Sequence, residues 1–116
     1  MTAKAWTHAE SSARRWGGVP EDYIAVHEKI DGTKAVHAEV THRCVFHSAF
    51  GIFLIEDIFG RRLTNSVGRE VHVRDIAEQH VLEDLGFIPS LNDWLKEMTP
   101  QPWMAGLRKL PVKVVD

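Results

Sequence analysis

The hydrophobic and polar positions of the chain follow a helical period over most of its length, and the longest such pattern runs from residue 33 to 59. Its second half, residues 44–59, is apolar on almost every side of a helical projection. Because a helix without a polar face must be covered on most sides, the pattern predicts one long buried helix around which the chain packs. Gly60 is placed to end it. The segment also carries His37, His42 and His47, the last of them at the start of the apolar half, so any polar chemistry is expected around these histidines.

Shorter helical patterns lie on both sides of this segment. Each combines an apolar stripe with residues that start or stop a helix, and together they predict four more helices: Ala9–Trp16, Pro20–Ile30, Asp75–Leu85 and a short helix over 91–98 that Ser90 caps. No repeat or linker separates these elements. Residues 1–116 are therefore expected to form a single compact domain, with 108–116 as an extended or disordered tail.

Residues 61–74 interrupt the helical period. Two β-prone pieces flank a turn that contains Asn65, Ser66 and Gly68, which is typical of a β-hairpin. Since an isolated hairpin is marginally stable in water, it is expected to pack on the helices. The predicted fold class is therefore mainly α: about five helices around one long central helix (33–59), with one small β-hairpin (61–74).

Composition narrows the classes of function. The chain has 116 residues and a formal net charge of −2, so no global positive field is available for nucleic acid or an anionic membrane. The single cysteine, Cys44, cannot form an internal disulfide, which favours a reducing compartment. The longest apolar run, GIFLI, is too short to cross a bilayer. We therefore expect a soluble, cytoplasmic protein.

Several histidines lie among apolar neighbours, with acidic side chains at helical contact spacing. His80 and Asp84 are four residues apart, as are His27 and Asp31, and such pairs share a helix face. A histidine that donates one ring nitrogen to a carboxylate keeps the other free for a metal or a proton. Zn or another divalent metal is therefore the candidate cofactor. The candidate ligands are His27, His42, His47, His80, Asp31 and Asp84.

The spacing leaves the membership of such a site open. His42 and His47 are about 140° apart around a continuous helix, so at most one of them easily shares a site with His80. We expect that residue to be His42. Glu78 is the candidate general base, although it lies off the His80 face. The HExxH pattern of zinc peptidases is absent. The competing interpretation is that the histidines are structural, satisfied by carboxylates and backbone carbonyls.

Basic side chains around the hairpin offer a different chemistry. Arginine binds phosphate through paired hydrogen bonds, so a phosphate or nucleotide is a third class of ligand. The competing interpretation is a solvated basic face. The candidate residues are Arg43, Arg61, Arg62, Arg69 and Arg74.

Three stretches carry a pattern that extends over nearly the whole chain: SSARRWGGVPEDYIAVHEKID, HRCVFHSAFGIFLIEDIFG, and TNSVGREVHVRDIAEQHVLEDLGFIPSLNDWL followed by PWM. In these stretches the chain resembles a family of short uncharacterised bacterial and phage proteins. The resemblance implies a site lined by histidines and acids, without an assigned activity. Thr41 and Phe46 stand where that family is expected to have basic residues, which argues against phosphate binding by the part of the surface that carries these two residues. The shared pattern includes His27, Asp31, Lys34, His42, Arg43, His47, Gly51, Asn65, Gly68, Glu78, His80 and Asp84.

Three functions remain open at this level. The first is a small soluble protein with a buried, hydrolase-like His/Asp site that binds a divalent metal. Whether such a protein is an enzyme stays open. The second is a non-catalytic phage or mobile-element module that binds a host or phage protein or forms a homo-oligomer, with structural histidines. The third is a phosphate or nucleotide binder that uses the hairpin arginines.

Overall fold

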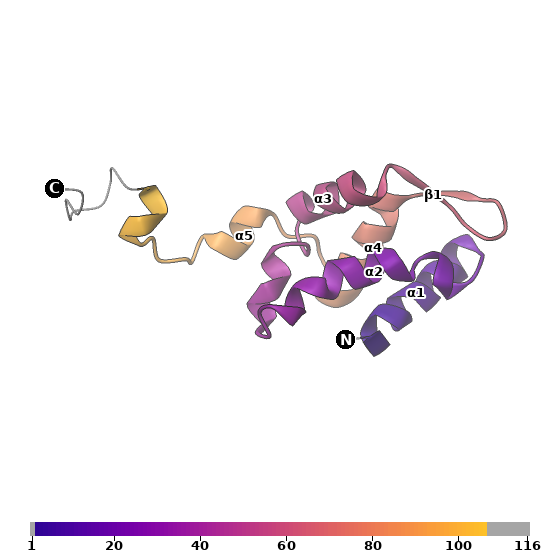
Figure 1. Cartoon of the computed structure of the whole chain (residues 1–116), viewed down its shortest axis with the longest axis horizontal. Helices are drawn as coiled ribbons and strands as arrows, with labels where there is room; N and C mark the ends of the chain where they lie inside the picture. The colour runs from indigo at the N-terminus through magenta and orange to yellow at the C-terminus, as the bar shows by residue number, and fades with distance from the viewer. Residues whose placement is uncertain (1, 107–116) are drawn as a thin grey trace.

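The computed structural model describes residues 2–106, so the tail predicted for 108–116 lies outside the described residues. The described chain is mainly helical, with five α-helices and one two-stranded antiparallel hairpin, which confirms the predicted fold class (Figure 1). The elements, in order, are α1 (Thr2–Trp16), η1 (Pro20–Asp22), α2 (Ile24–Asp31), η2 (Gly32–Ala35), η3 (Val40–Cys44), α3 (Ala49–Phe59), β1 (Arg62–Thr64), β2 (Glu70–His72), α4 (Val73–Leu85), α5 (Leu91–Leu95) and η4 (Pro102–Ala105).

The central segment differs from the continuous helix expected over 33–59. Two 3₁₀ turns, η2 and η3, replace its first half, and only α3 is α-helical. Ser48 has extended backbone angles, φ −153° and ψ 166°, and its hydroxyl accepts a hydrogen bond from the Gly51 amide at 3.0 Å. A serine in this conformation is a helix N-cap. The β-branched residues before it are weak helix formers, so local capping decides the break that apolar periodicity did not indicate.

Gly51 permits a close approach at this break. A Cβ at position 51 would collide with the backbone of Phe46, which crosses the first turn of α3. The start of α3 is also held by a hydrogen bond from the Ala49 amide to the Pro89 carbonyl at 2.8 Å. The chain between η3 and α3 therefore has a fixed path, and it carries His47 into the interior, where its side chain is fully buried.

Helix α3 is covered on one face only, which corrects the expectation that it is buried on most sides. Ile52 and Ile55 are buried, whereas Phe50, Phe53 and Ile58 are 48%, 58% and 50% exposed. An apolar helix face of this kind is unusual on an isolated small protein.

The core lies where α1, α2 and α4 pack together with the buried face of α3 (Figure 1). Strands β1 and β2 pair with Leu63 opposite Val71, and the buried Val71 fixes the hairpin on this core. Gly86 ends α4 in the left-handed conformation at φ 82°, as the sequence predicts. The core side chains are Ala9, Tyr23, Val26, Ile30, Ile52, Ile55, Val71, Val73, Ile76, Ala77 and Val81.

Beyond α5 the chain leaves this body as an arm, defined here as residues 96–106. Figure 1 shows α5 and the following turn extending away from the four packed helices, and the principal extents are 64 × 24 × 23 Å. The arm exposes Met98, Trp103 and Met104. Within the described residues, no helix is long and apolar enough to span a membrane.

Candidate metal centre

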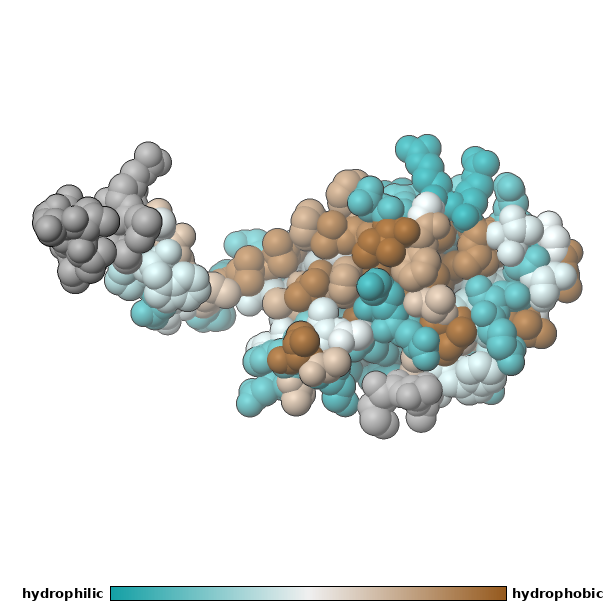
Figure 2. Space-filling model, in the orientation of Figure 1, coloured by the Kyte–Doolittle hydropathy of each residue, from teal (hydrophilic) through white to brown (hydrophobic). Residues whose placement is uncertain are grey.

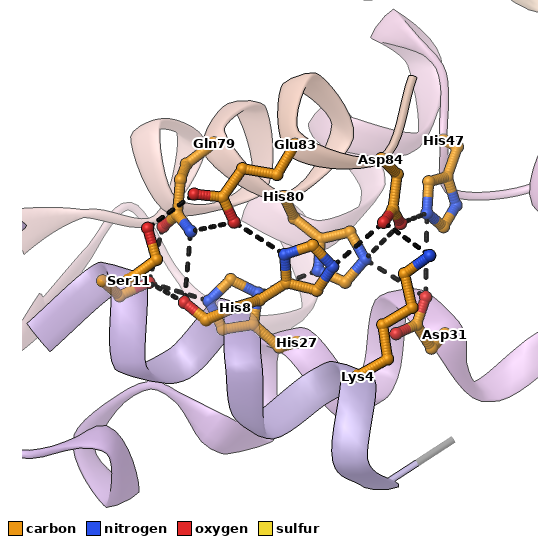
Figure 3. A network of polar contacts seen from close by, with 11 residues as sticks. Lys4, His8, Ser11, His27, Asp31, His47, Gln79, His80, Glu83 and Asp84 are labelled. Carbon is orange, nitrogen blue, oxygen red and sulfur yellow. Dashed lines mark hydrogen bonds and ion pairs between the residues drawn. The ribbon is translucent and has the colours of Figure 1, made fainter. Parts of the chain in front are cut away.

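Polar side chains from three helices meet inside the otherwise apolar core. Helices α1, α2 and α4 each contribute residues at i and i+4, which share a helix face. These pairs are His8 and Ser12, His27 and Asp31, and His80 and Asp84, and His47 joins them from the segment before α3 (Figure 3). Burial of so many polar groups is costly unless each is paired, so their partners decide what the cluster can do.

Four of these residues bring one ligand atom each to a common point. One atom from each of Asp31, His47, His80 and Asp84 lies within 4.8 Å of the other three. The Asp84 Oδ2 atom is 2.8 Å from His47 Nε2 and 3.2 Å from His80 Nε2. The Asp31 Oδ1 atom is 3.7 Å and 3.1 Å from the same nitrogens. Ligands about 2.0–2.1 Å from a tetrahedral ion are about 3.3 Å apart, so these four contacts bracket a tetrahedral edge.

The two carboxylate oxygens of Asp84 have different surroundings. Oδ1 faces cationic groups, with Lys4 Nζ at 2.9 Å and His8 Nε2 at 3.1 Å. Oδ2 faces the Nε2 atoms of His47 and His80. Burial alone raises the pKa of Asp84, but its hydrogen bonds to His47, His8, His80 and Lys4 outweigh burial and hold the pKa far below its usual value. The side chain is therefore an ionised carboxylate at neutral pH, and Oδ2 is directed at the centre.

The other two members of the group each have a buried atom without a partner. Among the described residues, Asp31 Oδ2 and His47 Nδ1 are the buried side-chain atoms that lack a hydrogen bond. Burial raises the pKa of Asp31, but the His80 hydrogen bond outweighs it, so the pKa is lowered overall. Burial lowers the pKa of His47, and the Asp84 hydrogen bond only partly opposes it. At neutral pH the group is thus rich in unprotonated ligands.

The orientation of the His80 ring follows from a relay of hydrogen bonds that runs from Gln79 through Ser12 and His27 to His80. The side-chain nitrogen of Gln79 is 3.1 Å from the His8 carbonyl and 2.8 Å from a Glu83 carboxylate oxygen. Both partners only accept hydrogen bonds, so this atom is the amide NH₂ and the Gln79 oxygen accepts. Ser12 lies 2.5 Å from that oxygen and must donate to it. The Ser12 oxygen then accepts from His27 Nε2 at 2.8 Å.

The same relay continues to the centre. Burial first, and then the neighbouring His80 and His8, lower the pKa of His27 to about 2, so His27 is neutral and its Nδ1 carries a lone pair. His80 Nδ1, at 2.8 Å, therefore donates to His27 Nδ1. The remaining His80 nitrogen, Nε2, points at the carboxylates of Asp31 and Asp84. Three acceptors facing one another require a cation between them, which is either an additional proton on His80 or a metal ion.

The His8 side of the cluster contrasts with this centre. His8 Nδ1 is 2.7 Å from Glu83 and its Nε2 is 3.1 Å from Asp84, so both ring nitrogens donate to carboxylates. Burial alone lowers the pKa of His8, but the two carboxylates outweigh it and raise the pKa. Ser11 also donates to Glu83 at 2.5 Å. Figure 3 shows this row of donors and acceptors between α1 and α4.

The structure places the other predicted residues outside the four-residue group. His27 contacts His80 in the relay just described. His42 lies nearby with its ring centroid 6.4 Å from that of His47. Its Nδ1 is 2.9 Å from the Thr33 hydroxyl, which itself donates to the His42 carbonyl, so Nδ1 carries the proton and Nε2 is left unprotonated. Burial, the nearby His47 and the nearby cations lower the pKa of His42.

Glu78 and the hairpin arginines lie on other surfaces. Glu78 lines a groove between α3 and α4 and is 3.8 Å from Arg74. Arg62 is 3.7 Å from Glu70 on the hairpin, and Arg69 donates to the Trp16 carbonyl at 3.4 Å. Arg43 is separate from this set, because it lines a small pocket beside Asp31.

Sequence reasoning missed the residues that support the centre: Lys4, His8, Ser11, Ser12, Gln79 and Glu83. For Lys4 and His8 the reason is the boundary of α1, which begins at Thr2 rather than at Ala9. The other four lie inside predicted helices, but the spacing within one helix does not show that α1 and α4 meet. With the earlier boundary, the spacing of Ala5, His8, Ala9 and Ser12 describes one buried stripe, and all four are buried. A polar residue on that stripe was the available signal.

Fold and site together define a small helical protein with a buried histidine–aspartate group that could hold a metal ion. The chain belongs to the family described as Domain of unknown function (DUF6915), whose model matches residues 3–104. No curated protein and no solved structure matched the chain.

Proposed function

We propose that this protein binds one divalent metal ion through His47 Nε2, His80 Nε2, Asp31 Oδ1 and Asp84 Oδ2. The observation that carries the proposal is the convergence of these four atoms within 4.8 Å of one another. Nearly all of this group is shielded from water, with His47 and His80 fully buried. Buried acceptors that face one another destabilise the fold unless a cation joins them.

The donor set restricts the metal. Two imidazole nitrogens and two carboxylate oxygens suit zinc and other first-row divalent ions, whereas Mg²⁺ and Ca²⁺ prefer oxygen ligands alone. The relay through His27 also supports binding, because a metal-ligating histidine commonly donates its other ring nitrogen to a second partner. That partner fixes the tautomer that leaves His80 Nε2 free for the ion.

Calorimetric titration of metal-free protein, purified without a nickel column, tests the proposal. We expect one Zn²⁺ or Mn²⁺ per chain in the wild type and a loss of at least about 100-fold in affinity for His80→Ala, since ligand removal exceeds the effect of removing a supporting partner. His72→Ala is the matched control, because His72 is exposed on β2. Absence of stoichiometric binding in the wild type, or equal losses in both variants, would contradict the proposal.

A second candidate function is self-association, and the exposed apolar surface favours it. Figure 2 shows apolar side chains over the body and along the start of the arm. Phe53 and Ile52 line a groove of about 140 Å³ between α3 and α4. Trp103 on the arm is 68% exposed. We infer that the arm of one copy docks on α3 of a second copy, because the arm exposes Trp103 and α3 presents an exposed apolar face that would cover it.

Size-exclusion chromatography with light scattering tests this candidate on the full chain. We expect a mass of twice the 13.2 kDa of one chain for the wild type. Trp103→Ala should shift the equilibrium toward the single-chain mass, because aromatic anchors dominate interface energies. Trp6→Ala, on α1, is the control for loss of an accessible tryptophan. A wild-type protein that stays at the single-chain mass at high micromolar concentration would remove this candidate.

A further inference from the structure

A small pocket opens beside the four-residue group. It has a volume of about 40 Å³, and Asp31 forms part of its wall. Asp31 therefore separates the proposed metal position from a space that solvent can enter. The other lining residues are Lys4, Lys34, His42 and Arg43.

The cations of this pocket are incompletely neutralised. Lys4 pairs with Asp84, but among the described residues neither Lys34 nor Arg43 has an ion-pair partner. When a divalent ion occupies the proposed site, its two charges are balanced by Asp31 and Asp84. The three basic side chains around the pocket then leave an excess of positive charge in a concave surface, where electric fields are concentrated. Arg43 is partly buried, so solvent screens its charge less than that of a fully exposed side chain.

His42 adds an acceptor to the same wall. Its Nδ1 proton is committed to Thr33, so its Nε2 carries a lone pair. Among the described residues Nε2 has no hydrogen-bond partner, and it is not one of the fully buried unpaired atoms. The pocket therefore combines two unpaired cations with one neutral acceptor, next to a position for a metal ion.

We propose that this pocket binds the phosphoryl group of a substrate, with its oxygens on Lys34 and Arg43 and with Asp31 between it and the metal ion. The inference rests on the proposed metal site. A phosphoryl dianion matches the excess charge better than a carboxylate, and its oxygens can contact several cations at once. A metal ion together with lysine or arginine is a common arrangement around transferable phosphoryl groups. Because the pocket has a volume of only about 40 Å³, the rest of the substrate stays outside it.

The experiment uses the full chain loaded with one Zn²⁺ and measures anion binding by calorimetry. Metal uptake is measured first, and inorganic phosphate is then titrated, with acetate as the carboxylate probe. We expect phosphate to bind and acetate to bind at least tenfold more weakly. The double variant Lys34→Ala/Arg43→Ala should keep metal uptake and lose at least tenfold in phosphate affinity.

The matched control is Arg61→Ala/Arg62→Ala, which removes two exposed charges from the hairpin. Its phosphate affinity should equal that of the wild type. The inference is overturned if metal-loaded wild type binds no phosphate, if acetate binds as tightly, or if the control loses as much affinity as the pocket variant. Failure of metal uptake in the first step would instead remove the metal site, and the phosphoryl site with it.

Discussion

The buried polar cluster has two halves, one around His8 and Glu83 and the other around the four-residue group that includes His80. Both combine histidines with carboxylates, but they differ in their hydrogen bonds. In the half around His8, both ring nitrogens of His8 meet ionised carboxylates, and Gln79 and Ser12 have complementary partners. In the half around His80, the Nε2 atom of that ring faces two carboxylates, and two buried atoms have no partner. The first half is complete without a ligand, whereas the second requires a cation, which is either a proton or a metal ion.

This difference means that some of the histidines fit the structural interpretation and others fit the metal-binding interpretation. His8 and His27 have protein partners on both ring nitrogens and lie outside the four-residue group. His47 and His80 have the arrangement of ligands. Identical residue types a few ångströms apart can therefore have different roles, and only the direction of each hydrogen bond separates them.

Metal addition should produce the largest effect, because it acts on the half that requires a cation. At a free Zn²⁺ concentration about 100 times the dissociation constant, binding to the native state alone adds about 2.7 kcal/mol to the free energy of unfolding. Thermal unfolding with Zn²⁺ and with a chelator measures the difference. Equal melting temperatures under the two conditions would mean that the second half is also complete without an ion.

Replacement of His8 should separate stability from metal affinity. His8→Gln removes the cation between Glu83 and Asp84 and should lower the free energy of unfolding by about 1–3 kcal/mol, as expected for buried charged hydrogen bonds. Metal affinity should stay constant or rise, because Asp84 loses a competing positive charge. Denaturant unfolding and calorimetry give the two quantities. A loss of metal affinity as large as that of His80→Ala would show that the two halves are not distinct.

The relay between the halves should have an intermediate effect. Ser12→Ala removes the acceptor for His27 Nε2, which relaxes the tautomer of His27 and therefore that of His80. We expect metal affinity to fall about tenfold, the lower end of the range for supporting partners of a ligand. The nitrogen-15 chemical shifts of the two rings report the tautomers directly. Unchanged shifts together with weaker binding would assign the effect to packing rather than to the relay.

A further prediction concerns the dependence of stability on pH. The pKa of His27 is lowered to about 2 in the folded protein, whereas a histidine in an unfolded chain titrates near 6.5. Between these values the unfolded state binds more protons, so the free energy of unfolding falls as the pH falls below about 6.5. His8 acts in the opposite direction, because its raised pKa stabilises the fold below about 6.5, and this contribution is lost as the pH rises through the folded value.

His27→Gln removes the larger of these two pKa changes. In metal-free protein, the free energy of unfolding of the variant should vary less steeply than that of the wild type between about pH 4 and 6. Chemical denaturation at several pH values measures the slope. A variant with the wild-type slope would show that His27 is protonated in the folded protein.

The fold class and part of the site could be predicted from the sequence because both depend on local spacing. His80 and Asp84, and His27 and Asp31, were paired correctly as residues on shared helix faces, since four-residue spacing survives in α4 and α2. The contribution of His47 could not be predicted in this way. Its position depends on the break at Ser48 and on the close approach that Gly51 permits, and apolar periodicity carries no information about either.

The same limit explains the placement of His42. On a continuous helix, His42 and His47 would diverge by about 140°, and we expected His42 to join His80. The 3₁₀ turn η3 and the cap at Ser48 bring His47 to the centre instead, and leave His42 beside the pocket. Which histidine joins the four-residue group therefore depends on the tertiary structure around the start of α3. The sequence signals that structure only through Ser48 and Gly51.

Anomalous diffraction from crystals of the zinc-loaded protein tests the central claim most directly. The claim predicts one peak about 2.0–2.2 Å from His47 Nε2, His80 Nε2, Asp31 and Asp84, with His8 still between Glu83 and Asp84. A peak at His8 and Glu83, or crystals that take up zinc only on the surface, would contradict the assignment of the ligand role to the half around His80.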